Sequence, residues 1–231
     1  SGFSVSAEGL LKEGKNLISV TARNSDQPNS RWYTGTGIYR PVYIHVLPKK
    51  HFVPESIRIT TVDWKKRKIR IEAELNCLGE AEFQIMDQGE CLKTECLTGE
   101  GLLSTEMEVE SAQLWSCDSP RLYKLRAVFG DDIQEVSFGI RTVTVNSREG
   151  FCINGERVIL RGACVHHDNG ILGACAYEDA EARKVRIMKK AGYNALRSAH
   201  NPCSKAFLKA CDKEGMLVMD EYVDVWYIHK T

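Results

Sequence analysis

The chain has 231 residues, of which 43% are hydrophobic and 27% charged, a composition typical of a globular protein with one to three domains. Lysine plus arginine and aspartate plus glutamate number 31 each, so the formal net charge is zero, which argues against a nucleic acid or an anionic membrane as partner. No apolar run reaches the roughly 18 residues that a membrane-spanning helix needs, and the N-terminal residues do not resemble a signal peptide.

Nine cysteines are present, so they cannot all pair within one chain. No Cys-x-x-Cys motif occurs, and the nearest pair, Cys91 and Cys96, has no histidine close by. This spacing does not favour a metal site or a disulfide framework. We interpret the cysteines as small buried hydrophobic residues and expect a reducing, cytoplasmic compartment.

Residues 1–47 are predicted to contain strands. "NLISVTARN" (16–24) alternates in polarity, and "GIYRPVYIHVL" (37–47) is apolar at every second position over much of its length. The stretch between them is rich in turn-forming residues but also carries Arg31, Trp32 and Tyr33. "PKKHFVP" (48–54) then has the composition of a linker.

Residues 55–141 are rich in predicted strands with frequent turns. "KIRIEAEL" (68–75) and "YKLRAVF" (123–129) place apolar side chains on one face, and "STEMEVES" (104–111) alternates acidic and apolar residues. This pattern predicts a small antiparallel β-sandwich.

From about residue 143 the pattern changes to alternating strands and helices. Asn154-Gly155 between two apolar runs predicts a hairpin. The strand "RVILRGA" (157–163) follows, and "YEDAEARKVRIMKKAG" (177–192) has the spacing of a helix that ends at Gly192.

A second strand and helix complete the repeat. "YNALRSA" (193–199) is predicted as a strand, and residues 201–215 as a helix with Asn201 as N-cap and Pro202 in its first position. "MLVMDEY" (216–222) is the next strand. The order β-α-β-α-β predicts the beginning of a parallel sheet.

Polar residues lie at or just beyond the carboxyl end of each of these three strands. Each group alone has a structural explanation: a histidine that completes a hydrogen-bond network, an arginine paired with a carboxylate, an acidic helix cap, or a core tryptophan. Together they favour a functional site, because neighbouring parallel strands lie about 5 Å apart and their carboxyl ends meet at one rim. The residues are His166, His167 and Asp168, then Arg197 and His200, then Asp220, Glu221, Asp224 and Trp226.

These motifs resemble glycoside hydrolase family 2, which contains β-galactosidases, β-glucuronidases and β-mannosidases. The family pattern Asn-x-x-Arg-x-x-His-Tyr-Pro is matched by "NALRSAHNP", except that Asn201 replaces the tyrosine. "INGERVILRGACVHHDNG", "LWSCDSPRLYKL" and "NSDQPNSRWYTGTGIYRPVYI" resemble further family segments in the same order. The last of these is closest to the galactosidase-like members.

The resemblance implies a multidomain β plus α/β fold. Residues 1–47 would end a jelly-roll sugar-binding domain, residues 48–141 would form an immunoglobulin-like β-sandwich, and residues 142–231 would form the first third of a (β/α)8 TIM barrel. It also implies a retaining exo-glycosidase that hydrolyses terminal β-D-galactosides by double displacement with two glutamates about 5 Å apart.

The resemblance assigns roles to individual residues. Asp26, His166 and His200 would bind the sugar, and Arg197 would orient the nucleophilic carboxylate and keep it ionised. Asp220 and Glu221 would support these residues from behind, and Trp226 could stack on a sugar ring. Some members bind magnesium just after the Asp-Glu pair, but Trp226 stands where the histidine ligand would be, so we predict no metal site and no cofactor.

In the family the acid/base glutamate follows an asparagine on a later strand, and the nucleophile lies later still. The sequence contains no Asn-Glu pair and reaches only what resembles the third barrel strand, so both catalytic glutamates are expected to lie outside these residues. Three parallel strands cannot close a barrel, so we expect this segment to belong to a longer chain, to be inactive alone, and to self-associate or form a homo-oligomer through its uncovered edge.

Three alternative interpretations exist. One is the same family with β-glucuronide or β-mannoside specificity. Another is a non-catalytic carbohydrate-binding β-sandwich protein, which would not need the β-α-β-α-β segment. A doubly wound nucleotide-binding fold is disfavoured, since "RGACVHHDNG" has no G-x-G-x-x-G loop.

Overall fold

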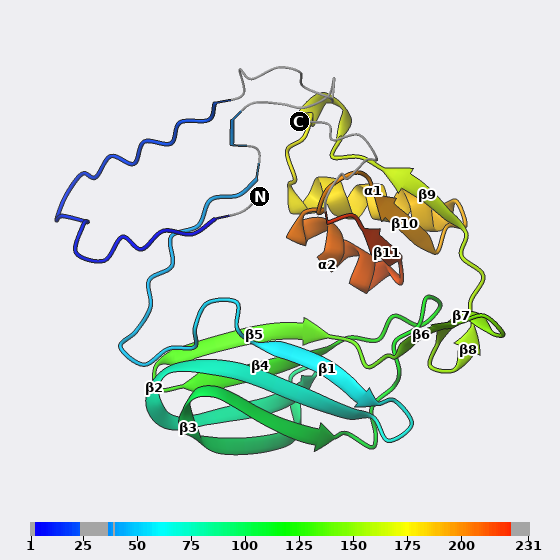
Figure 1. Ribbon diagram of the computed structural model, residues 1–231, viewed down its shortest axis with the longest axis horizontal. Coiled ribbons are helices and arrows are strands. Elements are labelled where there is room, and N and C mark those ends of the chain that lie inside the picture. The colour runs from blue at the N-terminus through cyan, green and yellow to red at the C-terminus, as the bar shows by residue number, and fades with distance from the viewer. Residues whose placement is uncertain (1–2, 24–36, 39, 223–231) are drawn as a thin grey trace. The chain divides into compact units, whose positions relative to one another are not determined.

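The computed structural model describes residues 3–23, 37–38 and 40–222 (Figure 1). The chain divides into two units, residues 1–39 with 225–231, and residues 40–224. Among the described residues, no helix is long and apolar enough to cross a membrane.

The strands expected in residues 16–24 and 37–47 do not form in the part of these ranges that the structure describes. Their apolar side chains are exposed: Leu17 is 94% and Val46 90% accessible. Alternating polarity stabilises a strand only when a neighbouring strand supplies hydrogen bonds and a second layer covers its apolar face. The described residues of these ranges have neither, and the jelly-roll assignment for residues 1–47 stays a prediction.

A five-stranded antiparallel sheet follows. β2 pairs with β1, β3 and β4, and β5 pairs with β4. β2 and β3 are long strands that pair over most of their length, with a register shift between Leu75 and Gly79. The strands are β1 Arg58–Asp63, β2 Lys68–Asp87, β3 Glu90–Glu108, β4 Tyr123–Phe129 and β5 Asp132–Phe138.

The apolar face of this sheet forms the largest core among the residues that the structure describes. Burial alternates along β2 and β4, as the sequence predicts. Phe52, which precedes β1, packs on the rings of Phe83 and Phe129, with ring centroids 6.2 and 5.8 Å away. The fully buried members include Phe52, Ile69, Ile71, Ala73, Phe83, Ile85, Leu125, Ala127, Phe129 and Ile140.

Three short antiparallel strands form a separate sheet: β6 Val143–Asn146, β7 Gly150–Ile153 and β8 Glu156–Arg157. Asn154 and Gly155 join β7 to β8 with φ values of 52° and 78°. Two successive positive φ angles are what a two-residue hairpin turn requires. The predicted hairpin is confirmed.

The last part of the chain is a parallel β-α-β-α-β unit (Figure 1). Its sheet has the order β11-β10-β9, with helices α1 and α2 beside it and a short 3-10 turn, η1, before α1. The elements are β9 Gly162–Val165, η1 Gly170–Leu172, α1 Glu178–Lys190, β10 Ala195–Ser198, α2 Lys205–Glu214 and β11 Leu217–Asp220. The predicted order of elements and parallel pairing are confirmed.

Two boundaries differ from the prediction. The strand expected from residue 157 pairs in the parallel sheet only from Gly162, because residues 158–161 connect the hairpin to the sheet. Helix α2 starts later than predicted, since its N-cap is Ser204, whose hydroxyl accepts from Phe207 N at 3.1 Å, and not Asn201. Asn201 Oδ1 instead contacts the ring of His167.

A second core lies between the helices and the parallel sheet. Val185 of α1 and Phe207, Ala210 and Cys211 of α2 pack with Leu196 of β10 and Met216. Asn194, buried just before β10, accepts from Arg161 N at 2.7 Å and donates to Ile159 O at 2.9 Å. This side chain ties the entrance of β9 to that of β10.

A third cluster joins the sandwich to the parallel unit. Trp115, fully buried, packs with Ile153 and Leu217, and its Nε1 donates to Asp212 O at 2.8 Å. Lys189 Nζ at the end of α1 donates to Cys117 O at 2.6 Å and to Gly215 O at 3.1 Å. We call this group (Trp115, Cys117, Lys189 and Gly215) the junction.

Candidate functional site

Residues of β10 alternate between two environments. Leu196 and Ser198 are buried on the helix side, whereas Arg197 points to the opposite face. The register places Arg197 opposite Cys164 of β9 and Met219 of β11. The face away from the helices therefore carries a guanidinium between a thiol and a thioether.

Arg197 is held by a carboxylate from the neighbouring strand end. Its Nε donates to Glu221 Oε1 at 2.7 Å, and its Nη2 forms an ion pair with the same oxygen. Its Nη1 lies 3.4 Å from Cys164 Sγ. These hydrogen bonds, above all the one to Glu221, raise the pKa of Arg197 above its ordinary value. The guanidinium is thus a fixed, permanent positive charge.

Two histidines lie together beyond the ends of β9 and β10. The rings of His166 and His200 have centroids 5.5 Å apart. His166 Nδ1 lies 3.0 Å from Ala199 O, which connects the residue after β9 to the loop after β10. The two imidazoles present ring nitrogens capable of donating or accepting hydrogen bonds.

The loop that carries His200, residues 199–204, is fixed at several points. Ser198 Oγ donates to Asn201 O at 3.1 Å, and Cys203 N donates to Asp220 Oδ1 at 3.0 Å. His167 Nε2 contacts Asn201 Oδ1, and Arg40 Nη2 donates to Pro202 O at 2.6 Å. The loop is therefore anchored to β10, β11, the segment after β9, and Arg40.

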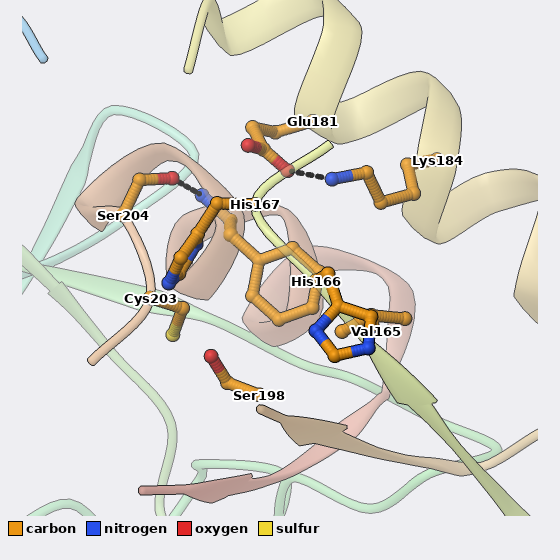
Figure 2. A pocket seen from close by; sticks show the side chains of 9 residues that line it. Val165, His166, His167, Glu181, Lys184, Ser198, Cys203 and Ser204 are labelled. Carbon is orange, nitrogen blue, oxygen red and sulfur yellow. Dashed lines mark hydrogen bonds and ion pairs between the residues drawn. The ribbon is translucent and has the colours of Figure 1, made fainter. Parts of the chain in front are cut away.

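A small pocket lies between the strand ends and the helices (Figure 2). Val165, His166 and His167 come from β9 and the residues after it, Ser198 from β10, and Glu181 and Lys184 from α1. Cys203, Ser204 and Phe207 line the side toward α2. Glu181 and Lys184 form an ion pair of 3.1 Å.

Burial changes the acidity of two groups in this pocket. It lowers the pKa of His167 below its usual value, an effect larger than the opposing effect of the hydrogen bond to Asn201. Burial, followed by the Asp220 carboxylate, raises the pKa of the Cys203 thiol to about 12. Both groups are therefore neutral near pH 7. The pocket therefore supports the loop through neutral groups and the Glu181–Lys184 pair, and the Arg197 guanidinium lies on the other face of the sheet.

The chain matches two sequence profiles of known families. The profile described as glycosyl hydrolases family 2 matches residues 56–141, and the one described as glycosyl hydrolases family 2, TIM barrel domain, matches residues 143–227. The two matches follow one another and cover most of the chain. The chain belongs to glycosyl hydrolases family 2.

Relatives in this family extend the match to nearly the whole chain. A putative beta-glucuronidase of Formosa agariphila is 35% identical over 94% of the chain, and a beta-galactosidase of Bacteroides ovatus is 34% identical over 99%. The solved structure of a glycosyl hydrolase family 2 member from Bacteroides cellulosilyticus superposes with a TM-score of 0.80 and 37% identity over 89% of the chain.

These relatives are much longer than the present chain. It spans 22% of the Formosa protein, 29% of the Bacteroides ovatus protein and 31% of the solved chain from Bacteroides cellulosilyticus. The expected fold class, an immunoglobulin-like sandwich followed by part of a TIM barrel, is confirmed by the two family matches and this structural likeness.

The structure brings together part of the predicted family 2 site. His166 lies beside His200, and Arg197 lies beside Glu221. Asp220 instead binds the backbone of the loop after β10. The predicted sugar-binding Asp26, and Asp224 and Trp226, lie outside the described residues. None of the described residues form a group of three or more His, Cys, Asp or Glu side chains that could hold a metal ion. The roles of these residues stay predictions.

Sequence reasoning missed Arg40 and Cys164. Cys164 could have been found by alternation, because it lies two residues before His166 on the same face of an extended segment. Arg40 gave no comparable signal, since its partner Pro202 is 162 positions away.

Proposed function

We propose that these residues supply part of the glycone-binding site of a retaining exo-glycosidase that hydrolyses terminal β-D-galactosides. The observation that carries the proposal is the arrangement at the ends of three adjacent parallel strands: Arg197 fixed by Glu221, with the His166–His200 pair following the same strands. Relatives named beta-galactosidase, from Bacteroides ovatus and Streptococcus thermophilus, support the galactoside assignment.

In this proposal Arg197 acts on the nucleophilic glutamate. A cation within about 4 to 6 Å lowers the pKa of a carboxyl group, so the nucleophile is ionised when the substrate binds. Glu221 holds the guanidinium in one orientation, and Arg197 can act without moving during the reaction.

His166 and His200 act on the sugar. Imidazole nitrogens donate to and accept from sugar hydroxyls, and such hydrogen bonds strengthen as positive charge develops on the ring in the transition state. The two glutamates that break the glycosidic bond, one acid/base and one nucleophile, are contributed by the rest of the full-length enzyme.

A second candidate is a β-glucuronidase. The Formosa agariphila relative carries the name putative beta-glucuronidase and matches the chain as well as the Bacteroides ovatus beta-galactosidase does. Arg197 does not distinguish the two candidates, because in this proposal its guanidinium, held by Glu221, acts on the nucleophilic glutamate and not on the glycone.

The test is a panel of nitrophenyl β-D-galactoside, β-D-glucuronide and β-D-mannoside with the full-length enzyme. We expect the highest kcat/KM with the galactoside, and NMR of the first-formed product should show the β anomer. A higher kcat/KM with the glucuronide would establish the second candidate. An enzyme that hydrolyses none of the three would contradict the proposal.

For the compartment we propose the cytoplasm. This is supported by the state of the nine cysteines, all of which are free thiols in the structure. Labelling with a thiol reagent of the protein denatured directly from a cell extract would test this, because cysteines oxidised to disulfides would not react, whereas buried thiols would become accessible.

A further inference from the structure

We propose that Arg40 is a positioning residue for His200, acting through the carbonyl of Pro202. The inference rests on the proposed function, since His200 matters as a sugar-binding group of that site. Arg40 precedes the sandwich, whose first strand begins at Arg58, whereas Pro202 belongs to the loop after β10. A residue from the first fifth of the chain thus holds the loop of the candidate site.

The contact is of a strong kind. Arg40 Nη2 lies 2.6 Å from Pro202 O, and the donor carries a positive charge. Charge-assisted hydrogen bonds of this length are about twice as strong as neutral ones. Arg40 itself is half-buried, whereas Pro202 and the hydrogen bond are exposed.

Pro202 is the point of the loop that most needs an external partner. Proline has no N–H, so the carbonyl is the only backbone group through which Pro202 can be held. Its neighbours are fixed otherwise: Asn201 O by Ser198, and Cys203 N by Asp220. Arg40 therefore supplies the remaining restraint at the centre of the loop.

The restraint reaches His200 directly, because only Asn201 separates the two residues. The His200 ring packs on His166 with centroids 5.5 Å apart, and the carbonyl of Ala199 lies 3.0 Å from His166 Nδ1. A loop that shifts at Pro202 would move His200 away from this arrangement. A misplacement of about 1 Å in a substrate-positioning group can lower the rate about a hundredfold.

The test uses the full-length enzyme with Arg40→Gln, Arg40→Lys and a matched control, Arg141→Gln. The Arg141 guanidinium stacks on Trp115 at 4.1 Å from the ring centroid, far along the chain from the loop. With nitrophenyl β-D-galactoside we expect Arg40→Gln to lower kcat/KM about ten- to hundredfold, mainly through KM. Arg40→Lys should recover much of the loss, because an ammonium group can donate to the same carbonyl.

Arg141→Gln should lower the thermal midpoint but change kcat/KM less than about twofold, since substitutions at distant sites act independently. Adding Asn201→Ala to Arg40→Gln should cost less than the product of the single effects, because both changes release the same loop. Equal loss of kcat/KM in Arg40→Gln and Arg141→Gln, or fully multiplicative effects of Arg40 and Asn201, would overturn the proposal.

A structural readout separates this inference from the proposed function. If the wild-type enzyme cleaves none of the three aryl glycosides, the proposed function fails while the positioning of His200 is still measurable. A crystal structure of the Arg40→Gln enzyme is expected to show residues 199–204 displaced and the rings of His166 and His200 moved apart. An unchanged loop in that structure would refute the role of Arg40 regardless of activity.

Discussion

Arg197 and Glu221 show how single side chains at strand ends combine. β10 and β11 are parallel neighbours, so their carboxyl ends bring the guanidinium and the carboxylate within hydrogen-bonding distance. The pair holds the Arg197 side chain in one orientation. An unpaired arginine, with four rotatable bonds, would sample many orientations.

Glu221→Gln in the full-length enzyme should lower kcat/KM for nitrophenyl β-D-galactoside about tenfold to a hundredfold. The amide keeps the shape, and its oxygen can still accept from the guanidinium, but the attraction between two opposite charges is lost, so the guanidinium is held less firmly. Steady-state kinetics measure the effect. Glu178→Gln is the control, because its pair with Lys209 is exposed on the helix surface and contributes little. Equal kinetics of the two variants would refute the role of Glu221.

Cys203 should resist alkylation at pH 8. A pKa raised to about 12 leaves roughly one thiol in ten thousand ionised at that pH, and only the thiolate reacts. Mass spectrometry after treatment of the native protein with iodoacetamide should find the exposed Cys91 modified well before Cys203. The rate at Cys203 should rise with pH. Similar rates at the two cysteines at pH 8 would contradict the assignment.

At the scale of elements, a glycine with positive φ follows each of the two helices, but the space around the two glycines differs. Gly192 follows α1 with φ 90°, and Gly215 follows α2 with φ 72°. Both angles lie in the left-handed region that favours glycine. A Cβ on Gly192 would meet nothing within 4 Å, whereas one on Gly215 would lie 2.2 Å from Cys117 O.

Gly192→Ala and Gly215→Ala therefore form a matched pair. Gly192→Ala should cost about 1 kcal/mol of unfolding free energy, from backbone strain alone. Gly215→Ala should cost roughly 3 kcal/mol or more, because the Cys117 backbone must also move. Chemical denaturation measures both. Equal losses would show that the contact between the α2 turn and Cys117 does not exist in solution.

Elements with a strong local pattern could be predicted from the sequence, and their boundaries could not. The buried positions of 68–75 and 123–129, the Asn154-Gly155 hairpin and the β-α-β-α-β order follow from local periodicity and turn chemistry. Asn201 and Ser204 are equally good helix caps by residue type. Only the tertiary contact of Asn201 with His167 leaves Ser204 as the cap, and local pattern carries no such information.

The candidate site was likewise predictable only in part. The sequence identified four of its residues, because they lie at or just after the ends of strands whose carboxyl ends must meet: His166, Arg197, His200 and Glu221. Arg40 was not identified, since a long-range hydrogen bond to a backbone carbonyl leaves no trace in residue spacing. The prediction of strands in residues 16–24 and 37–47 was wrong for the described residues for a related reason: a strand needs a pairing partner that can lie far away in the sequence.

At the scale of the whole molecule, the junction couples the sandwich to the parallel unit. Lys189 Nζ donates to one carbonyl from each side, Cys117 O and Gly215 O. Trp115 adds an indole hydrogen bond to Asp212 O of α2. The acceptors in these hydrogen bonds are backbone carbonyls. Their positions depend on the path of the backbone and not on which side chains the accepting residues carry.

Lys189→Met should destabilise the protein by about 1–3 kcal/mol, because two partly buried carbonyls lose their charged donor while the apolar stem is retained. Lys190→Met is the control: it lies on the same turn of α1 and is exposed. Thermal unfolding of both variants measures the difference. A Lys189→Met protein as stable as Lys190→Met would show that the junction contributes nothing.

Side chains along β10 point alternately to the two faces of the parallel sheet, so mutations on the two faces have different effects. Leu196 and Ser198 face the helices, while Arg197, with Cys164 and Met219 beside it in register, faces the other way. Randomising Cys164 and Met219 in a library would vary the surroundings of the guanidinium and leave the hydrophobic layer intact. Under the proposed function, substrate preference and foldability can therefore be engineered, and can evolve, as separate traits on the two faces of one parallel sheet.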